Sequence, residues 1–315
     1  MGPDAASAAA AAAAPAGADA PLEPVPSRAG RVKVRRGWSN VTGELIRRVC
    51  EDVWVVERAY DWLTVDVGGK TTVIRLPDGS LFVHAPLLLT ASLKASLAAL
   101  GPVSVIVVSN KEHVDCAAQW VAAYPDAVSL APPGYAATVD TPYTGDVPAD
   151  NTPHPAFQGV IEHTFMGGMP LFAESVFFHT PSGTLLATDL YWNWPAGVPR
   201  RTRFFAAGMD WVYKPVYEAF LVRDKARWQA ELERVLAWGG SVSFLATGLW
   251  RRGWTWRESC ALSTPLCLRS EGGLESARSR AVPLLLVTAF ACALCDTYML
   301  RDRRCWELVC HRGIR

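Results

Sequence analysis

The sequence lacks an excess of charge of either sign and lacks an apolar run long enough to cross a bilayer. Its 315 residues include 31 basic and 30 acidic side chains, a formal net charge of +1. A balanced charge provides no extended basic surface, so we expect no nucleic-acid partner. The apolar stretch 281–295 has fifteen residues with Pro283 inside it. A membrane span needs about 20 residues, so no stable membrane span is expected.

Cysteine is scarce through most of the chain. Cys50 and Cys116 are the two that precede residue 260, and the other six of the eight lie in the last 56 residues. This usage is typical of a reduced, intracellular protein. No basic segment precedes the first alanines, and Asp4 and Asp19 disfavour a transit peptide. We predict an intracellular protein, cytoplasmic in the first instance, with an organelle as the open alternative.

The two ends differ in composition from the middle. Residues 1–31 form an Ala/Pro-rich leader with twelve alanines in the first twenty positions, which predicts disorder. Residues 249–315 carry eleven arginines, no lysine and six cysteines. We interpret this tail as foreign to the fold, either a gene-model error or a lineage-specific extension. The alternative of a zinc ribbon at Cys292-x-x-Cys295 is disfavoured by the irregular spacing of the later cysteines.

Residues 32–248 alternate between β-like and helical runs. Helices are expected at 90–100, capped by Thr90, at 116–125 and at 218–238. A sheet covered by helices, an α/β fold, follows from this alternation. The expected strands are 53–60, 70–86 (two strands around a Pro-Asp-Gly turn), 102–110, 127–132, 159–165, 174–181 and 183–192.

The stretch "SNKEHVDCAAQW" (109–120) directly follows an apolar strand. It places His113, Asp115 and Cys116 at spacings that a metal or hydrolytic site can use. Asp189 likewise ends the apolar run "TLLAT". His113, Asp115 and Cys116 are therefore candidate metal ligands, and Asp189 is a candidate cleft residue; the resemblance given next implies that all four, Asp189 included, are ligand positions of a zinc site.

Several separated motifs resemble one uncharacterised, domain-of-unknown-function family within the metallo-β-lactamase superfamily. The resemblance covers about residues 45–248 and implies a metallo-β-lactamase-like αββα sandwich. The motifs are "VWVVER", "TTVIRLPDGSLFVHAP", "LGPV", "SNKEHV", "WVAAYPDA", "ESVFFHTPSGTLLATDLYWN", "RDK" and "ERVLAW".

The resemblance also implies a metal site with losses. Superfamily members hold zinc through H-x-H-x-D-H, a later histidine, a bridging aspartate and a final histidine. Here Lys111 replaces the first histidine and Cys116 the last of the motif, while His113 and Asp115 remain. The later histidine falls near Leu171, the final one becomes part of Ala246-Thr247-Gly248, and the bridging aspartate is kept as Asp189.

Each candidate also has an ordinary structural explanation. His113 suits a surface or capping position on a loop, and Asp115 suits the N-cap of the following helix. Cys116 is either a reactive thiol activated by the helix dipole or a buried, inert one. The further residues expected near a cleft are Lys111, His84 at its floor and His163, for which a place in the core is the alternative.

An aromatic and basic segment at 191–217 suggests three roles: stacking on nucleobases, contact with a membrane, or a lid over the cleft. The lid is preferred because the chain has no net basic domain.

Together these patterns predict a degraded metal site in a non-catalytic or unconventional small-molecule-binding domain, with no cofactor. The alternative is a single-zinc hydrolase acting on an ester, thioester or amide. Loss of three histidines favours the first, because carboxylates alone seldom replace imidazole ligands.

Overall fold

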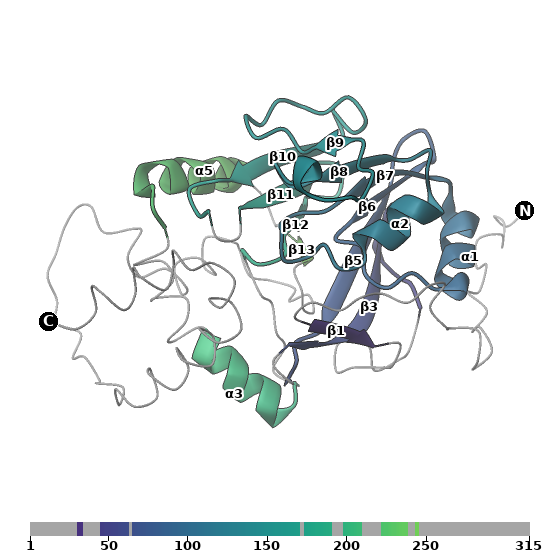
Figure 1. Ribbon diagram of the computed structural model, residues 1–315, viewed down its shortest axis with the longest axis horizontal. Coiled ribbons are helices and arrows are strands. Elements are labelled where there is room, and N and C mark those ends of the chain that lie inside the picture. Colours follow the sequence, from purple (N-terminus) through teal and green to yellow (C-terminus); the bar gives the residue numbers. More distant parts are fainter. Residues whose placement is uncertain are drawn as a thin grey trace, which may run out of the picture. The chain divides into compact units, whose positions relative to one another are not determined.

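The computed structural model describes residues 30–33, 45–62, 65–170, 173–190, 198–209, 222–238 and 243–245 (Figure 1). The leader before residue 30, the tail 249–315 and the aromatic positions Trp192, Trp194 and Trp211 lie outside these ranges. The expectations made for them remain predictions.

A nine-stranded mixed sheet forms the larger half of the described domain. Its order is β1-β3-β5-β6-β7-β8-β9, with β2 and β4 also paired to β3. The pairs from β6 to β9 are parallel and the others antiparallel. Its strands are β1 (Gly30–Lys33), β2 (Arg47–Cys50), β3 (Val53–Trp62), β4 (Val65–Asp66), β5 (Gly69–Arg75), β6 (Leu81–His84), β7 (Val103–Val107), β8 (Val128–Ala131) and β9 (Gly145–Asp146).

A second, four-stranded sheet has the order β10-β11-β12-β13. The first three strands are antiparallel neighbours, and β13 pairs parallel to β12. The strands are β10 (Ile161–Met166), β11 (Glu174–His179), β12 (Thr184–Leu186) and β13 (Ser243–Leu245).

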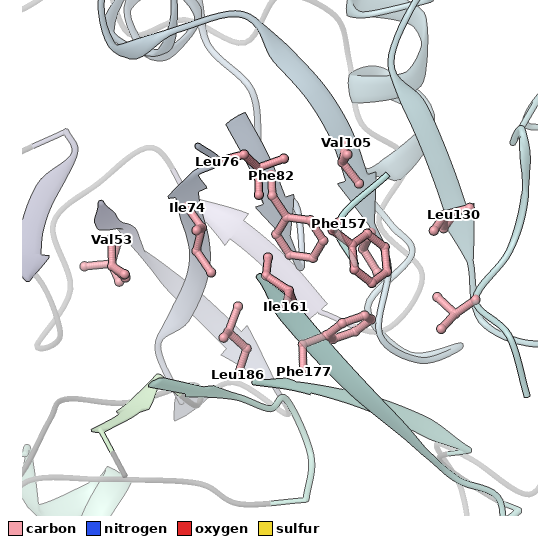
Figure 2. Packing of buried hydrophobic residues seen from close by; sticks show 13 residues of the cluster. Val53, Ile74, Leu76, Phe82, Val105, Leu130, Phe157, Ile161, Phe177 and Leu186 are labelled. Carbon is pink, nitrogen blue, oxygen red and sulfur yellow. The ribbon is translucent and has the colours of Figure 1, made fainter. Parts of the chain in front are cut away.

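The two sheets pack face to face through a shared apolar core (Figure 2). Phe82 of the large sheet and Phe177 of the small one meet edge to face with ring centroids 5.8 Å apart. Phe157, from the loop before β10, lies 5.3 Å from Phe82. Such offset aromatic contacts add to the burial of apolar area, so this cluster fixes one sheet against the other.

Helices cover the outer face of each sheet. The large sheet is covered by α1 (Ala91–Leu100) and α2 (Ala117–Ala123) (Figure 1). These helices bury Leu93, Leu97 and Trp120 against its strands. On the small sheet, α5 (Lys225–Ala237) buries Trp228 and Val235. Helix α3 (Arg200–Gly208) and a short 3₁₀ turn η1 (Ala136–Thr138) complete the described helices. The layers run helix, sheet, sheet, helix, which confirms the expected αββα arrangement.

The backbone turn between β10 and β11 is locked to α5. Both oxygens of Glu231 accept hydrogen bonds from backbone N–H groups, Oε1 from Gly167 at 3.0 Å and Oε2 from Gly168 at 2.9 Å. The Nε of Arg227 also donates to Glu231, at 2.7 Å. A Cβ at position 168 would lie 2.7 Å from the backbone nitrogen of Trp228. The turn therefore requires glycine there because the helix backbone passes so close.

The boundaries of two expected helices change. Helix α1 begins after Thr90, whose Oγ1 accepts from the backbone N–H of Leu93 at 3.2 Å, as expected. Helix α2 starts at Ala117, and α5 starts only at Lys225, after the N-cap Asp224. The expected helical residues 218–221 lie outside the described ranges, and the described helix begins after the Asp224 cap. Across the described ranges, we find no helix with the length and apolar character of a membrane span.

Candidate functional site

The candidate site lies at one edge of the sandwich, where strands of both sheets end. His84 ends β6, and Ser109 and Asn110 follow β7, at the carboxyl ends of two parallel strands. From the small sheet, Asp189 follows β12 and Glu174 begins β11, which runs antiparallel to it. The backbone N–H of Ser175 donates to the carbonyl oxygen of Ser109 at 2.8 Å. That bond joins the two sheets directly beneath the site.

Asp189 is held by two side chains of the large sheet's loop. Its Oδ1 lies 3.3 Å from Nε2 of His113, and its Oδ2 accepts a hydrogen bond from Nδ2 of Asn110 at 2.5 Å. The side chains of His113 and Asp189 remain 23% and 26% exposed. Both carboxylate oxygens are thus engaged, while both side chains keep part of their surface exposed to solvent.

Asn110 also shapes the loop that carries His113. Its Oδ1 accepts from the backbone N–H groups of Glu112 at 3.0 Å and His113 at 3.1 Å. An asparagine that bonds the backbone two residues on closes a tight turn. Its Nδ2 reaches Oγ1 of Thr188 as well, at 3.1 Å. Asn110 is fully buried, and it therefore holds the backbone that carries His113 on one side and the Asp189 carboxylate on the other.

A buried carboxylate supports Asp189 from below. Glu174 accepts hydrogen bonds from three successive backbone N–H groups, those of Thr188, Asp189 and Leu190. The bonds from Asp189 and Leu190 measure 2.9 and 2.7 Å. Three N–H groups converging on one carboxylate hold the segment after β12 in a single conformation.

Burial and neighbouring charges set opposite pKa shifts in this group. Burial acts to lower the pKa of His113, but the Asp189 carboxylate and its hydrogen bond outweigh that effect and raise it. Burial acts to raise the pKa of Asp189, while His113 and the Asn110 hydrogen bond bring it below its ordinary value. Burial and the charge of Asp189 raise the pKa of Glu174 to about 7, against the effect of its backbone hydrogen bonds. The imidazolium–carboxylate form of the His113–Asp189 pair is favoured.

His84, expected at a pocket floor, is buried beside the site. Its Nε2 lies 2.5 Å from Oγ of Ser109, and its ring meets Phe177 edge to face at 5.4 Å. Burial, with a contribution from His113, lowers the pKa of His84 to about 3. His84 is therefore a neutral imidazole that serves as a hydrogen-bonding part of the core.

The four candidate metal ligands do not come together as a set. Among the residues that the structure describes, no three His, Cys, Asp or Glu side chains are arranged to hold a metal ion. His113 and Asp189 meet, but a zinc ion needs three or four protein ligands. Asn110 adds N–H donors on the carboxylate, which is the wrong polarity for a cation. Among the described residues, His113 and Asp189 thus bring together two of the ligands that a zinc ion needs.

Asp115 and Cys116 are placed differently from expectation. The N-cap of α2 is Cys116, and no side chain caps the helix, so the prediction of Asp115 as the N-cap is wrong. The chain continues for one more residue before helical geometry begins. Burial and the charge of Asp115 raise the pKa of the Cys116 thiol to about 12, which contradicts a reactive thiolate and fits an inert one.

Lys111 and His163 take no part in the hydrogen bonds that hold the His113–Asp189 pair. Lys111 is exposed, so its ammonium group is not buried in a cleft. Its long side chain reaches solvent from the loop. His163 is buried in β10, where its Nε2 donates to the carbonyl of Pro148 at 3.2 Å and its ring stacks on Phe177. The core alternative for His163 is confirmed.

Sequence reasoning missed several polar residues at this edge: Asn110, Glu174 and Thr188. Glu112 and Tyr60 are further neighbours. Burial first, and then Asp189, raises the pKa of Glu112. Burial and the charges of Asp115 and Asp189 raise the pKa of Tyr60. A polar residue directly after an apolar strand, as in "VIVVSN", is the signal that could have identified Asn110.

Several solved structures are similar to this chain. The flavodiiron core of Flv1 from Synechocystis sp. PCC6803 shares 12% identity at a TM-score of 0.47, over 70% of this chain and 56% of that one. The metallo-β-lactamase FIM-1 from Pseudomonas aeruginosa, in its mono-zinc form, shares 11% at 0.46, over 70% and 93%. A metallo-β-lactamase from Pontibacter korlensis shares 12% at 0.39, over 65% and 91%. This chain thus spans little more than half of the flavodiiron core.

Comparison with curated proteins gave no match. A protein-family comparison did, over residues 50–227, with the family described as "Domain of unknown function (DUF4336)". The matched range covers β3 through the start of α5 and more than half of the sequence, including every residue of the candidate site. It confirms the resemblance to an uncharacterised family, and the chain belongs to DUF4336.

Proposed function

We propose that the edge carrying His113 and Asp189 is a small-molecule binding site that has lost the metal centre of a metallo-β-lactamase-type hydrolase. One observation carries the proposal: both Asp189 oxygens are engaged by protein donors, Asn110 and His113. A bridging carboxylate in a metal centre gives those oxygens to cations. Here those oxygens face hydrogen-bond donors of the protein instead.

The electrostatics support the same proposal. Asp189 favours the protonated form of His113, and a protonated imidazole has no lone pair to give to a metal. Binding a metal through His113 would require that proton to leave and the pair to separate. Formation of the His113–Asp189 pair therefore opposes metal binding by these two side chains.

The partly exposed side of the pair is the part open to a ligand. An imidazolium offers a donor and the adjacent carboxylate an acceptor within 3.3 Å. Such a donor–acceptor pair suits a small polar molecule, which it would orient without a covalent step. The function of this chain would then be recognition of such a compound.

A single-zinc hydrolase acting on an ester, thioester or amide is the second candidate. It is favoured by the adjacency of an imidazole and a carboxylate from different sheets, since both are zinc ligand types. A third ligand would have to come from a rearranged Asp115 or Cys116. A bound zinc with an open position would supply an activated water.

Elemental analysis of the purified full chain after mild chelation separates the two candidates. We expect less than one zinc per chain, with the same trace content in His113→Ala and Asp189→Ala. The matched controls are His154→Ala and Asp150→Ala, which remove the same side-chain types away from this edge. Stoichiometric zinc that disappears in both site variants and persists in both controls would overturn the proposal in favour of the hydrolase.

A further inference from the structure

Helix α3 (Arg200–Gly208) has an outward face of unusual composition. Its sequence, RRTRFFAAG, contains three arginines and no acidic residue. Phe204 is 72% exposed, and it is the large hydrophobic side chain that stands exposed among the described residues. Removing this ring from water would contribute favourable free energy to a contact that covers it.

The opposite face anchors the helix to the domain. Thr202, Phe205 and Ala206 are buried, and Oγ1 of Thr202 donates to the backbone carbonyl of Asp66 at 3.1 Å. With 3.6 residues per turn, burial of these three points Arg200, Arg203 and Phe204 away from the domain. The docked face thereby fixes the direction of the exposed one.

The arginines also oppose ordinary helix chemistry. The first turn of a helix favours acidic side chains, because its N–H groups carry partial positive charge. Here Arg200, Arg201 and Arg203 occupy that turn, and Pro199 provides no side-chain cap. Sequences break such a local rule mainly where function requires it. The composition is therefore better explained by an anionic partner than by helix stability.

We propose that the face formed by Arg200, Arg203 and Phe204 binds the surface of a membrane containing anionic phospholipid. The guanidinium groups contact lipid phosphates, and the ring of Phe204 inserts among the headgroups. Basic side chains around an exposed aromatic ring on a helix are the pattern of interfacial attachment. The proposal is independent of the small-molecule site.

Charge distribution favours a membrane over a nucleic acid. A nucleic-acid backbone is followed by a basic groove extending over several nucleotides, whereas the chain as a whole has a net charge of +1. One short basic helix with one exposed ring fits a flat anionic surface touched at a single place. Each arginine at such a surface strengthens binding by about fivefold.

The test is co-sedimentation of the full chain with phosphatidylcholine vesicles, with and without phosphatidylserine. We expect binding that needs phosphatidylserine and falls about 25-fold or more in the double variant Arg200→Glu/Arg203→Glu, from the two lost contacts. Phe204→Ser should weaken binding severalfold at every salt concentration, because the ring's contribution is apolar. The matched control, Arg223→Glu/Lys225→Glu, makes the same charge change at exposed positions outside α3 and should keep wild-type binding.

Circular dichroism melting of all variants shows whether the domain stays folded, as expected for changes on an exposed face. Equal binding by the wild type and the folded α3 double variant would overturn the proposal. So would equal binding to vesicles without phosphatidylserine. Binding to a single-stranded oligonucleotide but not to vesicles would also overturn it and identify α3 as a nucleic-acid contact.

Discussion

Two buried carboxylates, one on helix α5 and one on strand β11, hold backbone segments in similar ways. Glu231 of α5 accepts from the N–H groups of Gly167 and Gly168, and Glu174 of β11 accepts from three N–H groups at 188–190. They differ in their charged neighbours. Arg227 donates to Glu231, whereas the charge of Asp189 lies close to Glu174 and helps to raise its pKa.

This difference distinguishes the contact of Glu231, which serves stability, from that of Glu174, which lies at the candidate site. At the β10–β11 turn, a cation and two donors compensate a buried negative charge, as stability requires. At the sheet edge, the negative charges of Glu174 and Asp189 repel each other. This repulsion is retained at the place where His113 and Asn110 contact Asp189. Perturbed ionisation of this kind is a property of functional sites more often than of packing.

The largest expected effect tests the structural contact. Gly168→Ala would place a Cβ 2.7 Å from the backbone nitrogen of Trp228, so α5 must move away from the turn. We expect a loss of about 3 kcal/mol in the free energy of unfolding, measured by urea denaturation. Gly145→Ala is the control, because its nearest neighbour lies at 3.9 Å. Equal stabilities of the two variants would show that the turn and helix are not tightly packed.

A smaller loss is expected from Glu231→Gln. The amide keeps the shape of the side chain but replaces one acceptor with an N–H donor, which then faces a backbone N–H group. We expect destabilisation of about 2 kcal/mol by chemical denaturation. Glu233→Gln, on the exposed side of the same helix, should change stability by a few tenths of a kcal/mol. If Glu231→Gln lowered stability no more than Glu233→Gln does, Glu231 would not stabilise the turn. Its contrast with Glu174 would then not hold.

The smallest expected effect is the pH dependence that Glu174 creates. Its folded pKa of about 7 lies above the ordinary value, so between about pH 4.5 and 7 the folded protein holds more protons than the unfolded chain. Stability therefore falls as pH rises through this window, by on the order of 1–2 kcal/mol, since Asp189 takes part in the same titration.

Glu174→Gln should remove that slope when unfolding is measured at several pH values. The His113–Asp189 pair is distinguishable because its contribution is complete between about pH 4 and 6.5, and above that range it is lost as pH rises through the raised pKa of His113. A slope between pH 4.5 and 6 that persists in Glu174→Gln would show that another group carries it.

Much of the fold could be predicted from local sequence. Alternating apolar runs identified the strands around the Pro-Asp-Gly turn, and Thr90 with Leu93 and Leu97 identified the first outer helix. Strands that are buried on both faces have nearly continuous apolar sequences, which made these strands recognisable. These features depend on residues within one element, so a pattern of a few positions is enough.

The site was predicted only in part. His113 and Asp189 were expected because each follows an apolar strand, but nothing local shows that Asn110 joins them or that Glu174 holds the next segment. The bonds of Asn110 to Thr188 and Asp189 span 78 and 79 residues. Asp115 was assigned to the N-cap from its position alone. The helix starts one residue later than expected, so Cys116 takes the N-cap position instead.

Those long separations have a consequence for the order of folding. The large sheet is built mostly from neighbours in sequence, whereas the contact between His113 and Asp189 closes a loop of 76 residues. Closing long loops is entropically costly, and contacts of this range form late. During synthesis, the segment with Asn110 leaves the ribosome well before Asp189 does. The half of the site on the large sheet therefore stays incomplete until the small sheet docks, and the His113–Asp189 pair forms only when folding is nearly finished.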